Sequence, residues 1–268
     1  MSAGAFNGQL ELHDEVLQLF PSLEKEDIIK KAYEIREKAL SKDFYRCIDG
    51  LHFLKLGLKL NPFYGDTFQE GKLSKLRILE IGCCFGVDFR RLIVDGANIR
   101  DVFGVDLSEA LINLGFELFE DMEALKGRFI VADATSEDFV QTVSEQIGGT
   151  FDVIILQLVL HTVAEREMFL IQNIFQLLNS GGILIGSTVG TEENLDHQLY
   201  VGVGPQRRVI HSEHTLHSLL AFCGFSNIAI RLSKFSLHDC PIGWIEENFS
   251  FSLETACLGY MAFRCTKP

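Results

Sequence analysis

The spacing of apolar residues changes near residue 75 of this 268-residue chain. Before that point apolar residues recur at helical spacing, as in the stretch 23–40, where Ile28, Ala32 and Leu40 share a face. This pattern predicts helices over 14–20, 23–40 and 46–60. The last of these should end at Asn61-Pro62, because a residue before proline disfavours helical backbone.

After residue 75, short apolar runs alternate with helical patterns. The runs predict strands over 77–81, 101–105, 128–132, 151–157 and 182–188, and two late strands over 227–233 and 257–265. The patterns between them predict helices over 86–95, 108–119, 136–147, 164–179 and 212–223. Such alternation is typical of an α/β fold with a doubly wound, mostly parallel sheet, which binds its ligands at the carboxyl ends of the strands.

The run R-I-L-E-I-G-C-C-F-G, residues 77–86, has the pattern of a cofactor loop between a strand and a helix. Gly82 allows a sharp turn after the strand, and Gly86 leaves room where the helix begins. Glu80 places a carboxylate at the end of a buried strand, where it needs a partner such as an ammonium group. An acid there would repel the phosphates of NAD, so the loop favours S-adenosylmethionine (SAM), which has none.

Two further acids follow the next strands. Asp106, in F-G-V-D-L, is placed to accept both hydroxyls of a ribose, and Asp133, in I-V-A-D-A, to accept the amine of adenine beside Ala134. Two glycines alone are also explained by a structural turn, and Asp133 alone by a helix N-cap. The combination of three acids on three successive strand ends, Glu80 included, favours the cofactor site.

The motifs I-L-E-I-G-C-C-F-G, F-G-V-D-L-S, I-V-A-D-A, F-D-V-I-I-L-Q and L-L-N-S-G-G-I-L-I, within residues 75–190, resemble those of class I SAM-dependent methyltransferases. In the last motif we expect a helix to end at Ser180, with Gly181-Gly182 as its C-cap. The string G-C-C-F-G-V-D-F-R-R resembles a group of small fungal O-methyltransferases of polyketide and meroterpenoid biosynthesis, in which Cys-Cys replaces part of the glycine loop.

This resemblance implies a Rossmann-like, seven-stranded sheet over 75–268, preceded by a helical lid or substrate cap over 1–74. It implies SAM as cofactor and S-adenosylhomocysteine as product, with transfer to a carboxylate or hydroxyl of an apolar intermediate. The expected cofactor-binding residues are Glu80, Gly82, Cys83, Gly86, Asp88, Asp106, Leu107, Asp133, Ala134 and Gln157. Asp88 also has a simpler explanation as an acid at a helix N-terminus, and Gln157 as a satisfied polar residue at a strand end.

His161, after the fourth strand, and His211, expected in the loop after the fifth, are the candidate catalytic bases. A histidine matches at the position of His161 in the fungal group, although a buried histidine bonded to backbone explains it equally well. His211, His214 and His217 recur every three residues, with Ser212 as a helix N-cap. No acid or cysteine joins them in sequence, so we expect no metal.

Four residues are expected to bind substrate: Tyr45, Arg207, Arg208 and Trp244. Either arginine could hold a carboxylate through two hydrogen bonds, although solvated surface arginines are an equal alternative. Tyr45 belongs to the aromatic-rich N-terminal segment, and Trp244 lies between the last two strands. The 22 phenylalanines suit an apolar pocket, although ordinary core packing accounts for most of them.

The net charge of −13 argues against a nucleic-acid partner, which needs a basic surface. Seven cysteines without a C-x-x-C pair indicate reduced thiols, and the sequence has neither a signal-peptide pattern nor an apolar run that would span a bilayer. We therefore expect a cytoplasmic protein with a small-molecule substrate, possible as a homodimer. Three alternatives stay open: a SAM-binding protein catalysing a non-methylating step such as a cyclisation, a regulatory binding module, and an NAD dehydrogenase, which Glu80 disfavours.

Overall fold

A single mixed sheet organises the molecule. The computed structural model describes residues 12–41, 46–69, 71–202, 207–234 and 258–268, and within them nine strands form this sheet. The strands are β1 (Ile78–Ile81), β2 (Val102–Asp106), β3 (Phe129–Val131), β4 (Phe151–Gln157), β5 (Leu178–Thr191), β6 (Leu199–Val201), β7 (Arg208–Ser212), β8 (Ser226–Lys234) and β9 (Leu258–Thr266).

Helices cover the sheet and precede it. The α-helices are α1 (Asp14–Leu17), α2 (Lys25–Leu40), α3 (Arg46–Asp49), α4 (Tyr64–Thr67), α5 (Val87–Val94), α6 (Glu109–Phe119), α7 (Met122–Leu125), α8 (Phe139–Gln146), α9 (Glu167–Leu177) and α10 (Glu213–Phe222). Three 3-10 turns accompany them, η1 (His52–Leu54), η2 (Leu73–Lys75) and η3 (Leu160–Thr162). No helix in these described ranges is both long and apolar enough to cross a bilayer.

The expected doubly wound sheet is confirmed. Seven strands follow one another in the order β3-β2-β1-β4-β5-β9-β8, the first five parallel and β9 antiparallel to both of its neighbours. One apolar cluster joins a face of the sheet to α8, α9 and α10. A second joins the other face to α5 and to the segment 58–73. Burial on both faces explains why the central strands read as continuous apolar runs in the sequence.

The hairpin β6–β7 was not predicted from the sequence. β7 pairs parallel with β5 through Gly190 and Thr191 only, and antiparallel with β6. It therefore extends the sheet beyond the point at which β4 ends, next to η3. The expectation that His211 lies in a loop is wrong for this reason, since it belongs to β7. The expected N-cap at Ser212 is confirmed, because its hydroxyl accepts a hydrogen bond from the Thr215 N–H at 3.2 Å.

The predicted helix over 46–60 is wrong beyond its first turn. α3 ends at Asp49, and Leu51 then adopts left-handed backbone with φ 55°, which stops the helix. The chain continues through η1 and a series of turns. The apolar spacing that suggested a helix serves instead to bury Phe53, Leu54, Leu56 and Leu58.

The helix expected to reach Ser180 ends at Leu177 instead. Leu178 already pairs with Phe151 of β4, and the register shifts between Phe151 and Val153. Gly181, with φ 78°, lies in this irregular stretch and donates its N–H to the carbonyl of Lys267 at 2.8 Å. The glycine pair is therefore part of β5 rather than a helix cap.

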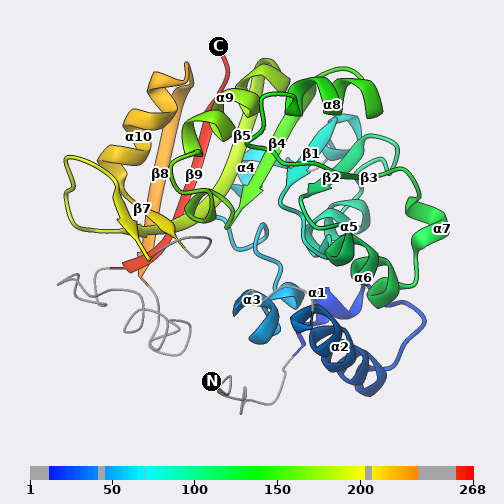
Figure 1. Ribbon diagram of the computed structural model, residues 1–268. Helices are drawn as coiled ribbons and strands as arrows, with labels where there is room; N and C mark the ends of the chain where they lie inside the picture. Colours follow the sequence, from blue (N-terminus) through cyan, green and yellow to red (C-terminus); the bar gives the residue numbers. More distant parts are fainter. Residues whose placement is uncertain (1–11, 42–45, 70, 203–206, 235–257) are drawn as a thin grey trace.

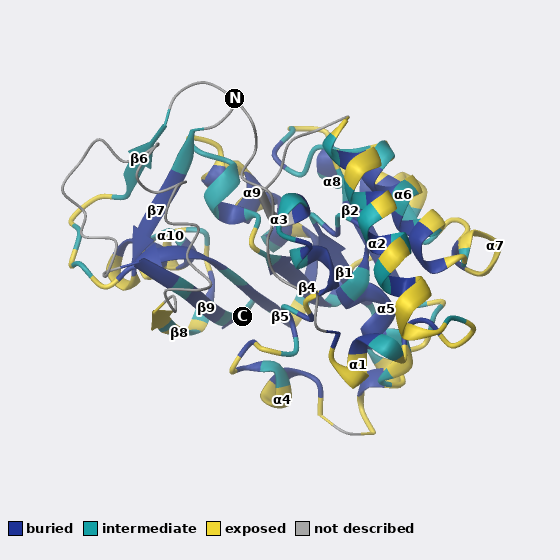
Figure 2. Ribbon diagram, turned by 90° about the horizontal axis from the view of Figure 1, so that it is seen from below, coloured by how far each residue is buried: buried dark blue, intermediate teal, exposed yellow. Residues whose placement is uncertain are grey.

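The N-terminal helices lie beyond one end of the sheet. In Figure 1 the parallel strands run downward, and α1, α2 and α3 lie below their carboxyl ends. α2 packs on α6, with Ala32 and Ile35 in the same apolar cluster as Leu111 and Leu118. Figure 2 looks onto this end of the molecule and shows buried strands behind helices whose outer faces are exposed. The carboxyl ends are thus the place at which both parts of the chain meet.

Candidate functional site at the carboxyl ends of the strands

The glycine loop joins β1 to α5 in a conformation that needs its glycines. The N–H groups of Gly82 and Cys83 both donate to the carbonyl of Val105, at 2.8 and 3.0 Å. Gly82 has φ 70°, and a Cβ there would lie 2.2 Å from Val159 Cγ2. Gly86 has φ 69° at the N-terminus of α5. The loop can therefore approach Val159, just after β4, closely only because residue 82 has no side chain.

Asp106 ties this loop to the end of β2. Its carboxylate accepts the N–H of Cys84 at 2.7 Å and the N–H of Ser108 at 2.9 Å. Cys84 has left-handed backbone, φ 52°, which is rare for a residue other than glycine and costs energy. The next side chain, Leu107, is 67% exposed. The end of β2 thus combines a half-buried carboxylate with an open apolar surface.

Glu80 and Asp88 are both buried behind the loop. Burial, followed by the nearby Asp88 carboxyl, holds the pKa of Glu80 well above its ordinary value. Burial raises the pKa of Asp88 to about 7. Asp88 Oδ2 accepts the N–H of Leu58 at 3.1 Å, whereas Asp88 Oδ1 and Glu80 Oε2 have no hydrogen-bond partner. The buried thiol of Cys83 lies beside them, and burial raises its pKa also.

Asp133 follows β3, and its carboxylate organises the turn that it begins. Oδ1 accepts both the N–H and the hydroxyl of Thr135, at 2.8 and 2.6 Å. Oδ2 accepts from Arg166 at 3.2 Å. The pKa of Asp133 is lowered, because these hydrogen bonds and the arginine outweigh its partial burial. A ligand amine would have to share this carboxylate, and the half-buried Ala134 lies next to it.

Gln157 is the last residue of β4, and His161 lies shortly after it in η3. The Ser187 hydroxyl donates to Gln157 Oε1, while Gln157 Nε2 is buried without a partner. His161 lies in η3, and its Nδ1 is likewise buried and unpartnered. Burial and then the nearby Arg208 lower the pKa of His161 to about 3. The imidazole is therefore neutral at pH 7.

The two arginines on the hairpin side have different surroundings. Arg207 forms an ion pair with Glu165 and lies over the ring of Tyr200, 4.8 Å from its centroid. The Arg208 guanidinium donates to the Arg207 carbonyl at 3.0 Å and acts electrostatically on His161. Arg208 is thus the arginine that the structure brings together with a candidate catalytic residue.

His211 is only 1% exposed and points into the packing around α10. Its Nδ1 lies 3.2 Å from the hydroxyl of Thr215, and burial lowers its pKa to about 4. Strand pairing with Gly190 fixes its position, which explains why it does not lie in an open loop. Two further expected site residues, Tyr45 and Trp244, lie outside the described residues.

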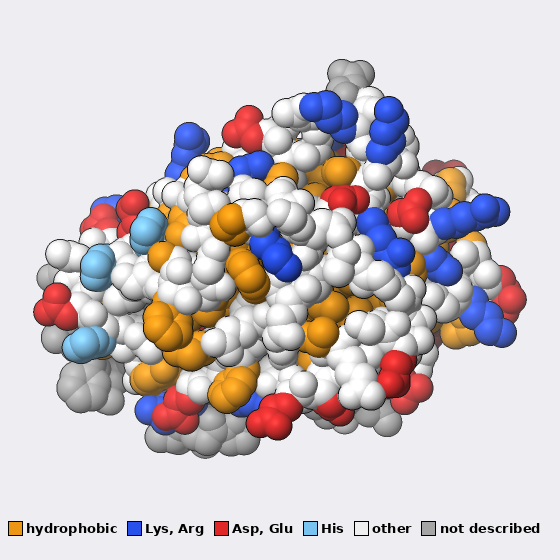
Figure 3. Space-filling view, turned by 90° about the horizontal axis from the view of Figure 1, so that it is seen from above, with side chains coloured by type: hydrophobic (Ala, Val, Ile, Leu, Met, Phe, Trp, Pro, Cys, Tyr) orange, Lys and Arg blue, Asp and Glu red, His pale blue; other side chains and the backbone are white. Residues whose placement is uncertain are grey.

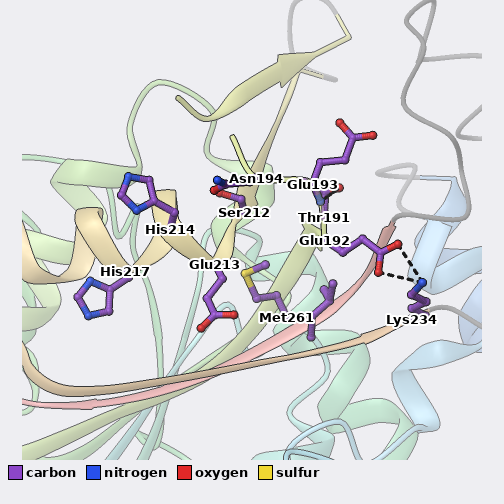
Figure 4. A pocket seen from close by; sticks show the side chains of 11 residues that line it. Thr191, Glu192, Glu193, Asn194, Ser212, Glu213, His214, His217, Lys234 and Met261 are labelled. Atoms are coloured by element: carbon purple, nitrogen blue, oxygen red, sulfur yellow. Dashed lines mark hydrogen bonds and ion pairs between the residues drawn. The ribbon is translucent and has the colours of Figure 1, made fainter. Parts of the chain in front are cut away.

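His211, His214 and His217 do not form a common site. Figure 4 shows His214 and His217 on α10, away from the ion pair of Glu192 and Lys234. These four side chains line an open depression of about 670 Å³ whose lining contains no residue of the glycine loop. Throughout the described residues, no group of three or more His, Cys, Asp or Glu side chains could hold a metal ion.

Some features of this edge were not predicted. Glu167, at the start of α9, is 4% exposed and accepts the Tyr200 hydroxyl at 2.6 Å, which fixes the hairpin against α9. Leu158 has left-handed backbone, φ 54°, and is 37% exposed beside Val159. No short motif marks these residues. Only the position of Leu158 directly after a buried strand could have drawn attention to it.

Residues 72–234 match the family model described as a methyltransferase domain. Over 146 residues, 54% of this chain, the sequence is 33% identical to the O-methyltransferase atr3 of Stereocaulon alpinum. Other relatives are methyltransferases of Aspergillus and Penicillium species. The match covers 42% of the length of atr3, 58% of that of a methyltransferase of Aspergillus terreus and 59% of that of the fungal O-methyltransferase phiE, so the chain spans about half of each.

Solved structures share the fold. An O-methyltransferase from a trans-AT polyketide synthase multienzyme of Brevibacillus brevis, in complex with S-adenosylhomocysteine, aligns with TM-score 0.57 at 16% identity, covering 92% of this chain and 81% of that one. The [4+2]-cyclase SpnF aligns with TM-score 0.51 at 19% identity, covering 72% and 75%. At these identities the likeness concerns the fold alone. The family match, by contrast, covers more than half of the sequence, and the chain belongs to the methyltransferase domain family.

Proposed function

We propose that the protein is a SAM-dependent O-methyltransferase that acts on a small apolar polyketide or terpenoid intermediate of secondary metabolism. The observation that carries the proposal is a set of buried, unpartnered polar atoms along one edge of the sheet: Glu80 Oε2, Gln157 Nε2 and His161 Nδ1. Buried polar atoms in proteins are nearly always hydrogen-bonded, so such a set at the carboxyl ends of parallel strands indicates a ligand site.

The residues at this edge fit SAM. Glu80 offers a buried acceptor to an ammonium group, and Gln157 Nε2 offers a donor to a carboxylate. Asp106 is placed to accept ribose hydroxyls, and the exposed Leu107 offers an apolar surface for the adenine ring. When bound, SAM supplies an electrophilic methyl group on a sulfonium. Cys83, Gly82 and Gly86 shape the loop that holds it, and Asp133 with Ala134 forms the far wall.

Among the possible acceptors, His161 and Arg208 favour a carboxylate. A carboxylate is ionised at pH 7 and needs no base, whereas a hydroxyl does. With a pKa near 3, His161 is a weak base and suits a hydrogen-bonding role. Arg208 beside it supplies the positive charge that would hold an anionic substrate. His211 is bonded to Thr215 through Nδ1, whereas its Nε2 is buried without a partner, so we assign it a supporting role in β7 rather than contact with substrate.

The N-terminal segment is proposed as the cap over this site, with residues 1–74 as cap and 75–268 as the SAM-binding core. Support comes from the position of α1–α3 beyond the carboxyl ends (Figure 1). The segment is also part of the core, because Leu58 and Phe63 pack in the same cluster as Ile78 and Phe89. Dimerisation and a cytoplasmic location stay predictions.

The deciding experiment incubates purified protein with methyl-labelled SAM and a panel of apolar carboxylic acids and phenols. We expect label in a base-labile methyl ester. His161→Asn should lower kcat about tenfold or more with SAM affinity unchanged within about threefold, and Arg208→Gln should raise KM for the acid. Label in a phenol ether instead would exclude the preference for a carboxylate.

The alternative is a SAM-binding protein that catalyses a cyclisation without methyl transfer, for which the shared fold of a [4+2]-cyclase is the only support. Parallel measurement of SAM consumption and substrate loss separates the two functions. Substrate loss without formation of S-adenosylhomocysteine would favour the alternative, and an absence of SAM binding would exclude both.

A further inference from the structure

Two buried carboxyl groups lie behind the glycine loop without a direct cationic partner among the described residues. Glu80 is 4% exposed and Asp88 is 5% exposed, and each keeps one oxygen without a hydrogen bond. The other Asp88 oxygen accepts the Leu58 N–H, and Glu80 accepts a backbone hydrogen bond from Phe89. The two groups act on each other electrostatically, and two buried carboxylates that do so cannot both stay ionised cheaply.

The groups that face this pair do not neutralise it. Arg90 attracts Glu80, but its guanidinium bonds Asp121 at 2.6 and 2.8 Å and the carbonyls of Phe85 and Gly86 at 2.6 and 3.0 Å. Asp106 repels Glu80 from the end of β2.

Three more groups near the pair are already neutral or paired. The pKa values of the Cys83 thiol and the Tyr64 hydroxyl are both raised, so neither group is charged. Arg91, on the same helix, is paired with Asp95. At neutral pH the pair formed by Glu80 and Asp88 therefore retains a proton, consistent with the raised pKa of both groups.

The pair also touches the N-terminal part of the chain. Residues 51–58, here called the strap, contact the glycine loop at Phe85 and the first turn of α5 at Asp88. The Phe53 ring meets the Phe85 ring edge to face, 4.6 Å between centroids, and the Leu58 N–H reaches Asp88 at 3.1 Å. A Cβ on Gly57 would lie 3.5 Å from the same Asp88 oxygen. The strap is therefore held in place by the side chain of Asp88, whose charge changes with pH.

We propose that Glu80 and Asp88 form a proton-exchanging pair that couples cofactor binding to the strap. Binding of the cationic cofactor releases one proton from the pair to solvent, and the carboxylate left on Asp88 holds the Leu58 N–H more strongly. The inference rests on the proposed function, because it places the positive charge of SAM beside Glu80. Asp88 acts as a positioning residue, through Leu58, rather than by contact with the methyl group.

The sign of the pH dependence follows. Below about pH 7 the free protein holds the proton that must leave, so SAM affinity should fall as pH falls, by up to about tenfold per pH unit. Above that range the affinity should level off. His161 and His211 stay neutral throughout, because their pKa values lie near 3 and 4.

Isothermal titration with SAM in two buffers of different ionisation enthalpy tests the proposal, because it counts the protons released. For the unmodified protein we expect about 0.5 to 1 proton at pH 6.5 and nearly none at pH 8. Asp88→Asn should at least halve that count. Asp95→Asn is the matched control, since Asp95 also bonds the N-terminal segment through Tyr64 but its pKa is lowered, so it is ionised throughout.

The outcomes separate the inference from the function. SAM binding without proton release, or an equal count in Asp88→Asn, would overturn the inference and leave the proposed function standing. No SAM binding at any pH would overturn both. If Asp88→Asn does not fold, hydrogen exchange on the unmodified protein decides: SAM should slow exchange of the Leu58 amide at least fivefold, and unchanged exchange would overturn the coupling.

Discussion

The two ends of the parallel strands differ in how far their polar side chains are hydrogen-bonded. At the amino ends, the side of the molecule seen in Figure 3, Arg77 donates its N–H to Asp152 at 2.9 Å and its guanidinium to the carbonyls of Ile147 and Gly148. Asp152 also accepts from Asn179 at 2.8 Å. These hydrogen bonds join the start of β1 to β4 and to the turn after α8, and they join β4 to β5; only the Nε of Arg77 is left without a partner among these atoms.

At the carboxyl ends, by contrast, Glu80, Gln157 and His161 each leave a buried atom unpaired, and Cys84 and Leu158 hold left-handed backbone. Unpaired polar atoms and backbone strain both cost stability, by roughly 1–3 kcal/mol each. Because one edge pairs most of its polar groups and the other leaves several atoms open, we expect the amino ends to stabilise the fold and the carboxyl ends to bind the ligand. Substitutions should therefore affect unfolding at one edge and ligand affinity at the other.

The largest effect should follow Gly82→Ala. The new Cβ would lie 2.2 Å from Val159 Cγ2, in a backbone conformation with φ 70°. We expect a loss of roughly 2–4 kcal/mol in the free energy of unfolding, or collapse of the loop with loss of SAM binding. Urea unfolding and SAM titration measure the two. Adding Val159→Ala should recover part of the loss by relieving the clash, and no recovery would show that the clash is not its cause.

Next in size should be Asp106→Ala. This change removes the acceptor for the Cys84 and Ser108 N–H groups and the proposed acceptor for the ribose hydroxyls. SAM affinity should fall at least tenfold, which is about 1.4 kcal/mol. Asp106→Asn should retain part of the affinity, because its amide oxygen can still accept. Unchanged affinity in the alanine variant would show that this edge is not the cofactor site.

A smaller effect, on stability rather than on SAM affinity, is expected from Asp152→Ala at the amino ends. Loss of the acceptor for Arg77 N–H and Asn179 Nδ2 should lower the free energy of unfolding by about 1 kcal/mol. SAM affinity should change less than about twofold, because the residue lies at the other end of β4. A large loss of affinity without a loss of stability would contradict the division into two edges.

The sequence predicted the sheet because burial on both faces leaves continuous apolar runs that spacing alone can identify. β8, β9 and the N-cap at Ser212 were predicted for similar local reasons. The hairpin β6–β7 was missed because β7 joins β5 through two residue pairs only. The helix over 46–60 was wrong because its apolar residues pack against the core from turns.

For the site, the sequence predicted individual residues but not the contacts between them. The apolar residues around Glu80 predicted an acid at the end of a buried strand, and Glu80 is buried as expected. That Asp88 shares its environment depends on Leu58, thirty residues earlier in the chain, which contacts it. Likewise, the neutral state of His161 follows from burial and from Arg208, which a long-range hairpin brings near. The protonation states of Asp88 and His161 thus depend on residues far away in the chain, which a local sequence pattern does not reveal.

The smallest effect should have the opposite sign to that of Asp152→Ala. Burial raises the pKa of Asp88 from 3.8 to about 7, so the folded protein binds this proton more tightly than the unfolded chain does. Stability from this group is complete below about pH 4 and is lost as pH rises through 7. Asn at this position carries no charge, so without cofactor Asp88→Asn should be more stable at pH 8 by about 1 kcal/mol, and the gain should vanish by about pH 6.

Urea unfolding of variant and unmodified protein at both pH values measures this difference, and the opposing contributions of His161 and His211 cancel in the comparison. Asp95→Asn is again the control: the pKa of Asp95 is lowered by Arg91 and Tyr64, so its loss should destabilise at pH 8. A less stable Asp88→Asn at pH 8 would mean that the Leu58 hydrogen bond outweighs the cost of the buried charge. A more stable one would identify Asp88 as a group retained at the binding edge at the expense of stability.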